Sequence, residues 1–348
     1  SRLKQIKIYT GKCFRVSLNE KGWKIFISAA IITVLISSVT SRDMFSAYSA
    51  TRNGAFALVC ACIWIGIFNS IQSICKERDI IKREHRSGLH ISSYITSHMI
   101  FEMALCAIES VIVTLITCLT NLSNLPDNGV LCTTFLELTI TFFLIIYSSD
   151  ALGLMISSIV KTPNTAMTVM PFILIIQLVM SGMIFELSGI TELISKITIA
   201  KWGLNAICIT ANINAMENCV PTLVSEYEYS ISHLAQLWLT LILFTLIYGV
   251  ISVISLKFVD FYSKISRRIL LNLGCIVFFL LLELMLAGTG IGAIAAILWI
   301  YNLLSFCDKE KTQYIRTIQI TLPNGEKTSC ALFEQRVYAY APTIMAFF

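Results

Sequence analysis

Long runs of apolar residues alternate with short polar segments along most of this chain. A helix that crosses a membrane needs about 20 consecutive, mostly apolar residues. Several stretches approach this length once their flanks are counted, and we predict a membrane span in each: residues 25–39, 55–74, 99–119, 131–160, 166–185 and 234–256. The pattern therefore predicts an all-α polytopic membrane protein, built on a six-span unit over residues 25–262.

A further apolar run covers residues 269–306 and is interrupted by Gly288, Gly290 and Gly292. Basic residues flank this run on both sides, which favours an extra membrane hairpin over residues 263–306 that returns to its starting side. One long tilted or interfacial helix is the alternative.

The remaining tail, residues 307–348, alternates weakly between apolar and polar positions around Asn324-Gly325. Asn-Gly between two such runs is the strongest short signal for a β-hairpin. We therefore expect a small β-hairpin in a cytoplasmic tail.

The composition excludes an ordinary soluble protein. Hydrophobic residues make up 56% of the chain and charged residues only 14%, whereas soluble domains carry about 25% charged residues. The net charge of +5 does not indicate nucleic-acid binding, because the basic residues lie beside apolar runs and not on one soluble face. Six of the 12 cysteines fall inside apolar runs, where cysteine acts as a small hydrophobic residue.

The basic residues also predict the orientation in the membrane, since short cytoplasmic loops are rich in Lys and Arg. Residues 75–98 contain five basic residues, and the loop at 186–232 is more acidic than basic. We therefore place the N-terminus, the 75–98 segment and the C-terminal tail in the cytoplasm, and the 186–232 loop outside. The membrane expected is the plasma membrane, or the inner membrane of a bacterium.

Residues 1–24 carry seven basic residues and one acidic residue, interleaved with apolar positions. Such a pattern is typical of an amphipathic helix that lies along the inner membrane surface. A basic, solvated tail is the alternative interpretation.

Two segments carry a resemblance to a known family. One reads IFNSIQSICKERDIIKREHRSGLHISSYITSHMIFEM, at residues 67–103, and the other reads SGMIFELSGITELISKITIAKWGLNAI, at residues 181–207. With six spans around them, they resemble the membrane half of an ABC-2 type exporter in the G-type layout (white and pleiotropic drug resistance). The resemblance covers about residues 1–262, and the segments beyond it depart from the pattern.

The resemblance implies a mechanism as well as a fold. Two six-helix halves, expected to form a homodimer, pair around a cleft and alternate between inward-facing and outward-facing states as ATP binding closes two nucleotide-binding domains. ATP and Mg are expected on those domains, because Gly11-Lys12 is followed by Cys13 and this chain has no phosphate-binding loop. The ATPase is expected upstream in a longer product or on a separate chain.

The charged segment at 75–98 is the predicted coupling loop. Glu77, Arg78 and Arg83 are the predicted contacts with the nucleotide-binding domain, since charged residues on a short rigid element can pair across a domain interface. The alternative is that the positive charge serves only to keep the loop in the cytoplasm.

The resemblance places the substrate cleft between the second and fifth spans, with an apolar outer gate above it. The predicted cleft residues are Cys62, Ile65 and Asn69, which share a helical face, together with Ile175 and Leu178; the predicted gate residues are Met183 and Ile184. An apolar lining would suit a hydrophobic or amphipathic small molecule, lipid or peptide. Helix packing or lipid contact is the alternative role for each residue.

Acidic residues within the spans mark pathways by default, because they are costly in lipid. Glu102 and Glu109 share a face of the third span and can bind a cationic substrate or relay protons; interior hydrogen bonds are the alternative. Cys208 and Cys219 can form a disulfide in the outer loop if that side is oxidising. The four histidines lack metal-ligand spacing, so no metal site is expected.

Two other functions stay open at the level of sequence. An ion-coupled transporter or channel would use the Glu102/Glu109 face without ATP. A membrane anchor or sensor that does not transport would bind a partner through residues 313–348.

Overall fold

A computed structural model describes most of the chain. The described residues are 2–19, 22–40, 43–126, 128–184, 189–216, 225–261, 315–321 and 327–333. The chain divides into two compact units, Ser1–Phe261 and Tyr262–Phe348. Each unit is described separately.

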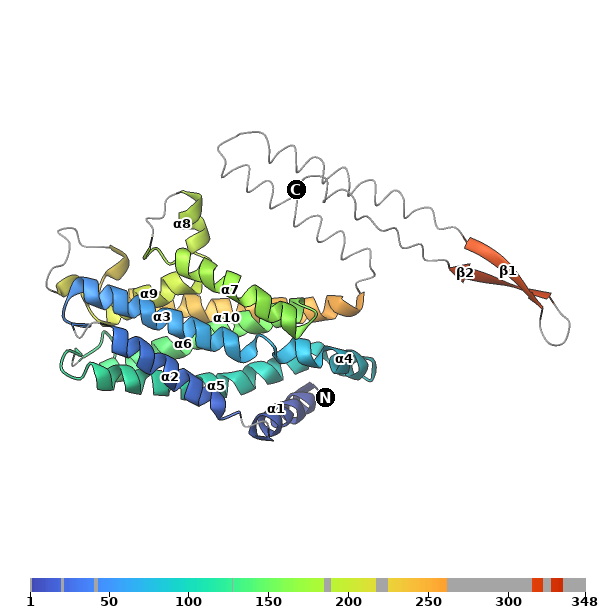
Figure 1. Ribbon diagram of the computed structural model, residues 1–348, viewed down its shortest axis with the longest axis horizontal. Helices are drawn as coiled ribbons and strands as arrows, with labels where there is room; N and C mark the ends of the chain where they lie inside the picture. The colour runs from blue at the N-terminus through green and yellow to red at the C-terminus, as the bar shows by residue number, and fades with distance from the viewer. Residues whose placement is uncertain are drawn as a thin grey trace. The chain divides into compact units, whose positions relative to one another are not determined.

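The first unit is helical (Figure 1). Its elements are α1 (Arg2–Asn19), α2 (Lys24–Val39), α3 (Tyr48–Ser70), α4 (Ser73–Arg86), α5 (Ile91–Thr120), α6 (Thr134–Ile159), α7 (Pro163–Val179), α8 (Ile190–Ser195), α9 (Ile199–Thr210), the 3-10 turns η1 (Ile213–Ala215) and η2 (Ser225–Tyr227), and α10 (Ile231–Phe261). Each of the six predicted spans coincides with a helix, namely α2, α3, α5, α6, α7 and α10. The prediction of an all-α membrane domain is confirmed.

Not all of these helices are long and apolar enough to cross a membrane by themselves. Within the described residues, four helices are long and apolar enough to cross a membrane by themselves: α3 with its continuation α4, α5, α6 and α10. Helix α2 qualifies only together with α1, from which it is bent by 70°, and α7 has 17 residues. The count of six therefore stays a prediction.

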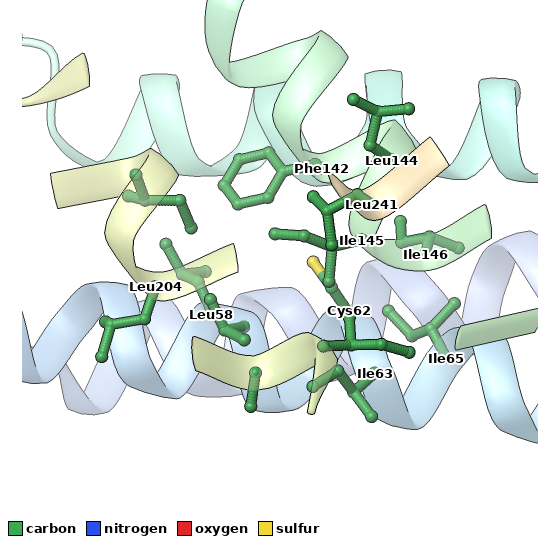
Figure 2. Packing of buried hydrophobic residues seen from close by; sticks show 14 of the residues in the cluster. Leu58, Cys62, Ile63, Ile65, Phe142, Leu144, Ile145, Ile146, Leu204 and Leu241 are labelled. Atoms are coloured by element: carbon green, nitrogen blue, oxygen red, sulfur yellow. The ribbon is translucent and has the colours of Figure 1, made fainter. Parts of the chain in front are cut away.

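Helix α6 is the centre of the bundle and packs against α3, α5, α9 and α10. Its approach to α3 depends on two glycines. A Cβ added at Gly66 would lie 2.3 Å from the carbonyl oxygen of Ile146, and one added at Gly153 would lie 2.3 Å from the Ser70 hydroxyl. Figure 2 shows the apolar core between these helices, where Cys62 and Ile65 of α3 lie among Ile145 and Ile146 of α6.

Helix α4 continues α3 after a short turn and ends at Arg86, two residues before Gly88, whose φ of 103° suits only glycine well. Ile74 and Ile81 recur seven residues apart and are both buried, so the helix has one apolar face. The Ser157 hydroxyl of α6 accepts hydrogen bonds from the backbone N–H groups of Ile74 and Cys75, both at 3.1 Å. These bonds satisfy donors that the first turn of a helix leaves unpaired.

Helix α9 is almost wholly buried and packs against α3, α6 and α10. The Gln177 side chain of α7 fixes its start, because Gln177 Oε1 accepts from the N–H groups of Ile199 (2.9 Å) and Ala200 (3.3 Å).

The second unit contains a described antiparallel pair, β1 (Ile315–Thr321) and β2 (Lys327–Phe333), in which Ile318 pairs with Cys330. These strands flank the Asn324-Gly325 pair at which the sequence predicts a hairpin. The turn itself, the predicted membrane hairpin at 263–306 and the rest of the tail lie outside the described residues.

Candidate functional site

The Glu77 carboxylate of α4 joins three helices. Its Oε1 lies 3.3 Å from Lys12 Nζ of α1, and its Oε2 accepts a hydrogen bond from the Tyr94 hydroxyl of α5 at 3.0 Å. The Lys12 and Glu77 side chains are both about one-third exposed, so water screens the ion pair only in part. Glu77 thus connects the charged helix to both the N-terminal helix and a span.

A second contact lies two helical turns further along α4. The Tyr9 hydroxyl of α1 donates to Glu84 Oε2 at 2.8 Å, and the Tyr9 and Tyr94 rings meet edge to face at 5.9 Å. Burial, with the Glu84 hydrogen bond, raises the pKa of Tyr9 to about 12. The hydroxyl therefore keeps its proton and remains a donor at physiological pH.

A third contact closes the turn between α4 and α5. Gln5 of α1 donates from Nε2 to the carbonyl oxygen of Gly88 (3.0 Å), and its Oε1 accepts from the N–H of His90 (3.1 Å). Gln5, Tyr9 and Lys12 are four and three residues apart, so they share one face of α1. We call this set of contacts the α1–α4 clamp; it lies at the end of the bundle where Figure 1 shows α1 beside α4.

The structure separates the three predicted coupling residues. Glu77 faces α1 and α5 within the clamp. Arg78 is only 9% exposed, and its guanidinium donates to the carbonyl oxygen of Val160, just after α6. Of the three, only Arg83 is exposed to solvent.

Arg83 belongs to an exposed face of α4 that the sequence reasoning missed. Lys76, Asp79 and Ile80 share this face with it, and Ile80 is 39% exposed. Asp79 and Lys82 form an ion pair at 3.8 Å. The seven-residue spacing of the buried Ile74 and Ile81 was the signal that could have identified the opposite face as the free one.

The predicted cleft residues do not share one environment. Cys62 and Ile65 are 0% and 3% exposed and lie in the core of the chain, as Figure 2 shows. Asn69 is turned to α5, where its Nδ2 lies 2.9 and 2.8 Å from the two carboxylate oxygens of Glu109. Ile175 of α7 is 56% exposed, and Leu178 is partly buried.

Other residues of α3 and α7 form the free surfaces of these helices. On α3 the exposed side chains are Asn53, Trp64 and Phe68, and Ala57 and Cys60 are half-buried on the same face. On α7 Phe172 and Ile176 are exposed beside Ile175. Sequence could not identify these faces, because a span that is apolar all round has no polar side to set its rotation.

The acidic residues within the bundle fall into two kinds. Glu109 is hydrogen-bonded to Asn69, whereas Glu102 Oε2 and both carboxylate oxygens of Asp150 are buried without a hydrogen-bond partner among the described residues. No Lys or Arg of the described segments forms an ion pair with any of the three. Burying such a group without a partner is costly unless it is neutralised.

At the opposite end of the bundle, Met183 packs against the core and Ile184 is half-exposed. Cys208 of α9 is buried. Cys219 lies outside the described residues, so the disulfide stays a prediction.

Comparisons with known proteins agree with the predicted class. The model of the ABC-2 type transporter family matches residues 4–212. The ABC transporter ATP-binding/permease protein Rv1747 of Mycobacterium tuberculosis is 26% identical over 178 residues, which are 51% of this chain and 20% of that protein. The chain thus matches about a fifth of the length of this relative.

Proposed function

This chain belongs to the ABC-2 type transporter family, and we propose that it is the membrane half of an exporter in the G-type layout, driven by a nucleotide-binding domain that contacts α4. Membership implies an integral membrane protein with a transport role that associates with nucleotide-binding domains. The direction of transport, the apolar substrate and the homodimer are parts of the proposal.

The observation that carries the proposal is the position of α4. This charged helix continues α3, and the clamp connects it to α1 and α5 through Glu77 and Glu84. Its free face presents Lys76, Asp79 and Arg83. A domain that pushes on this face would move α1, α3 and α5 together, since the clamp and the turn at Ile71 link all three helices.

The proposed cleft forms where the exposed faces of α3 and α7 meet those of a second copy. Trp64, Phe68, Phe172 and Ile175 are large apolar side chains on these faces. A cleft lined in this way suits a hydrophobic or amphipathic substrate. ATP and Mg belong to the nucleotide-binding domain, and the name of the mycobacterial relative, which combines ATP-binding and permease parts, supports a fused arrangement.

The proposal is tested with the full-length protein and its nucleotide-binding domains in membrane vesicles. Met183→Cys is labelled from the outside with a membrane-impermeant maleimide, with and without ATP and Mg. We expect ATP to change the labelling rate, and Arg83→Glu to abolish this change. Arg15→Glu, a charge reversal at another exposed cytoplasmic arginine, is the matched control and should leave the response intact.

If ATP does not change the labelling rate of Met183→Cys in the otherwise unchanged protein, the exporter proposal is overturned. In that case an ion-coupled transporter gains support, because Glu102 and Asp150 offer buried carboxyl oxygens that have no hydrogen-bond partner among the described residues. A labelling rate that follows the pH gradient but not ATP would establish that alternative.

A further inference from the structure

Arg52 stands in an unusual place for a basic residue. It lies in the second turn of α3, at the end of the helix opposite the cytoplasmic α4, where the predicted topology puts the outer surface. Short outer loops and span ends are usually poor in Lys and Arg. An arginine at this position calls for a reason other than orientation.

The Arg52 side chain turns into the protein and contacts the predicted outer gate. Its Nη2 donates to the carbonyl oxygen of Gly182 at 3.4 Å, and the guanidinium also interacts with the Tyr227 hydroxyl of η2. Tyr227 is only 4% exposed. Burial raises the pKa of Tyr227 above its ordinary range, so the hydroxyl stays neutral beside the cation.

The neighbouring residue anchors the same end of α3. The Thr51 hydroxyl accepts from the N–H of Phe45 at 2.9 Å and lies 3.2 Å from the sulphur of Met216. Thr51 and Arg52 therefore connect α3 to three outer segments: the turn before it, the segment after η1 and the turn after α7.

The gate turn itself is well defined. Gly182 has a φ of 79°, a conformation that favours glycine, and the Met183 N–H donates to the Ser181 hydroxyl at 3.2 Å. The hydroxyl of Thr198, just before α9, donates to the carbonyl oxygen of Met180 at 3.4 Å. The turn is thus held to α9 from one side and to α3, through Arg52, from the other.

The charge of Arg52 is only weakly satisfied. Its Nε is buried without a hydrogen-bond partner, and no carboxylate in the described part of the chain forms an ion pair with it. A long bond to a neutral carbonyl can break and re-form more readily than a buried ion pair, whose disruption is strongly destabilising.

We propose that Arg52 is a positioning residue that latches the outer gate: its contacts with Gly182 and Tyr227 hold the turn at Ser181–Ile184 against α3 in the closed state and release it when the gate opens. The role of the latch rests on the proposed exporter function. The contacts of the latch belong to the resting protein, so they can be tested without ATP.

The test measures labelling of Met183→Cys by an impermeant maleimide in the full-length protein without nucleotide. Arg52→Gln is expected to raise the labelling rate about tenfold, the lower end of the effect of losing a hydrogen bond to a charged group. Arg52→Lys keeps a cationic donor but loses the planar guanidinium with its several N–H groups, and it should give an intermediate labelling rate. Tyr227→Phe removes only a hydroxyl and should raise the rate by a smaller factor.

Two controls separate a latch from general loosening. The native Cys132 is exposed and makes no contact with Arg52, so its labelling should not change. Lys201→Gln breaks the 3.1 Å ion pair between Lys201 and Glu226, the residue next to Tyr227, and should leave Met183→Cys labelling unchanged.

An unchanged rate at Met183→Cys in both Arg52→Gln and Tyr227→Phe would overturn the latch. So would an equal rise at Cys132, because it would show a loss of structure at this end of the molecule. These rates are measured without ATP, so they test the latch separately from the exporter function. The latch proposal can fail while labelling still responds to ATP, and the exporter proposal can fail while the latch proposal holds.

Discussion

At the scale of single residues, the clamp depends on Glu77. Its carboxylate forms an ion pair with Lys12 of α1 and accepts a hydrogen bond from the Tyr94 hydroxyl of α5. The pair with Lys12 is partly exposed, so its contribution to stability is about 0.2–1 kcal/mol. A contact of this size does not determine the fold. Its value to a transporter would lie in making α1 and α4 move together.

A double-mutant cycle tests this coupling. Lys12→Met and Glu77→Gln should each reduce the ATP-dependent change in Met183→Cys labelling, and the double variant should be no worse than the more affected single variant, because both remove the same ion pair. The control is Lys7→Met, an exposed residue of α1 outside the clamp. Additive losses from Lys12→Met and Glu77→Gln would contradict a shared role.

Replacing Glu102 or Glu109 of α5 by methionine should change the stability of the protein in different directions. Glu102→Met replaces a buried carboxyl that has an unpartnered oxygen, so thermal stability should stay equal or rise. Glu109→Met leaves the partly buried Asn69 amide without its acceptor, which should destabilise by about 1–3 kcal/mol. The measurement is the unfolding temperature in detergent, and the same sign for both variants would contradict the assignment.

Residue-level prediction from the sequence is possible only where the pattern contains directional information. On α4 the interleaved Ile74 and Ile81 define a buried side, and the free side follows from them. In α3 nearly every position is apolar, so the sequence gives no reason to prefer the face of Cys62 over that of Trp64. The partner of Asn69 is likewise decided by the packing of α3 on α5, which no local pattern encodes.

At the scale of elements, α3 and α6 meet at Gly66 and Gly153. Helix positions were predictable because runs of apolar residues form helices in a membrane, where each backbone N–H and C=O must be paired within the segment. Which helices touch was not predictable, because the close approach depends on single glycines in otherwise ordinary spans. Helix α9 falls within the loop predicted at 186–232, and its 12 residues are too few to cross a bilayer.

Two alanine variants test the close contact between α3 and α6 at Gly66. Gly66→Ala puts a Cβ 2.3 Å from a backbone oxygen of α6, so the helices must separate, at a cost of about 1–3 kcal/mol. Gly11→Ala in α1 meets nothing within 4 Å and should stabilise slightly, because alanine favours the helix by about 1 kcal/mol. Thermal unfolding of the two variants should therefore shift in opposite directions, and a tolerated Gly66→Ala would contradict the packing described.

At the scale of the whole molecule, the described helical unit has two working ends. One end carries the clamp and the free face of α4, and the other carries the predicted gate turn with Arg52. The long helices α3 and α5 extend between these ends, so in the proposed mechanism a push at α4 would reach the predicted gate through rigid helices. The sequence predicted both ends in outline, but it could not predict that α1 would be bound to α4 at Gln5, Tyr9 and Lys12.

The measurement that tests the account most directly is site-specific photo-crosslinking from Ile80, the exposed apolar residue on the free face of α4. A photoreactive phenylalanine analogue at this position, in native membranes, should crosslink to a nucleotide-binding domain, on the same chain or a partner, with a yield that changes on adding ATP and Mg. The same analogue at Leu18, an exposed residue of α1, should not. Crosslinks from Ile80 to lipid alone, with no ATP-binding domain captured and no response to ATP, would contradict the proposal that this face receives the driving force.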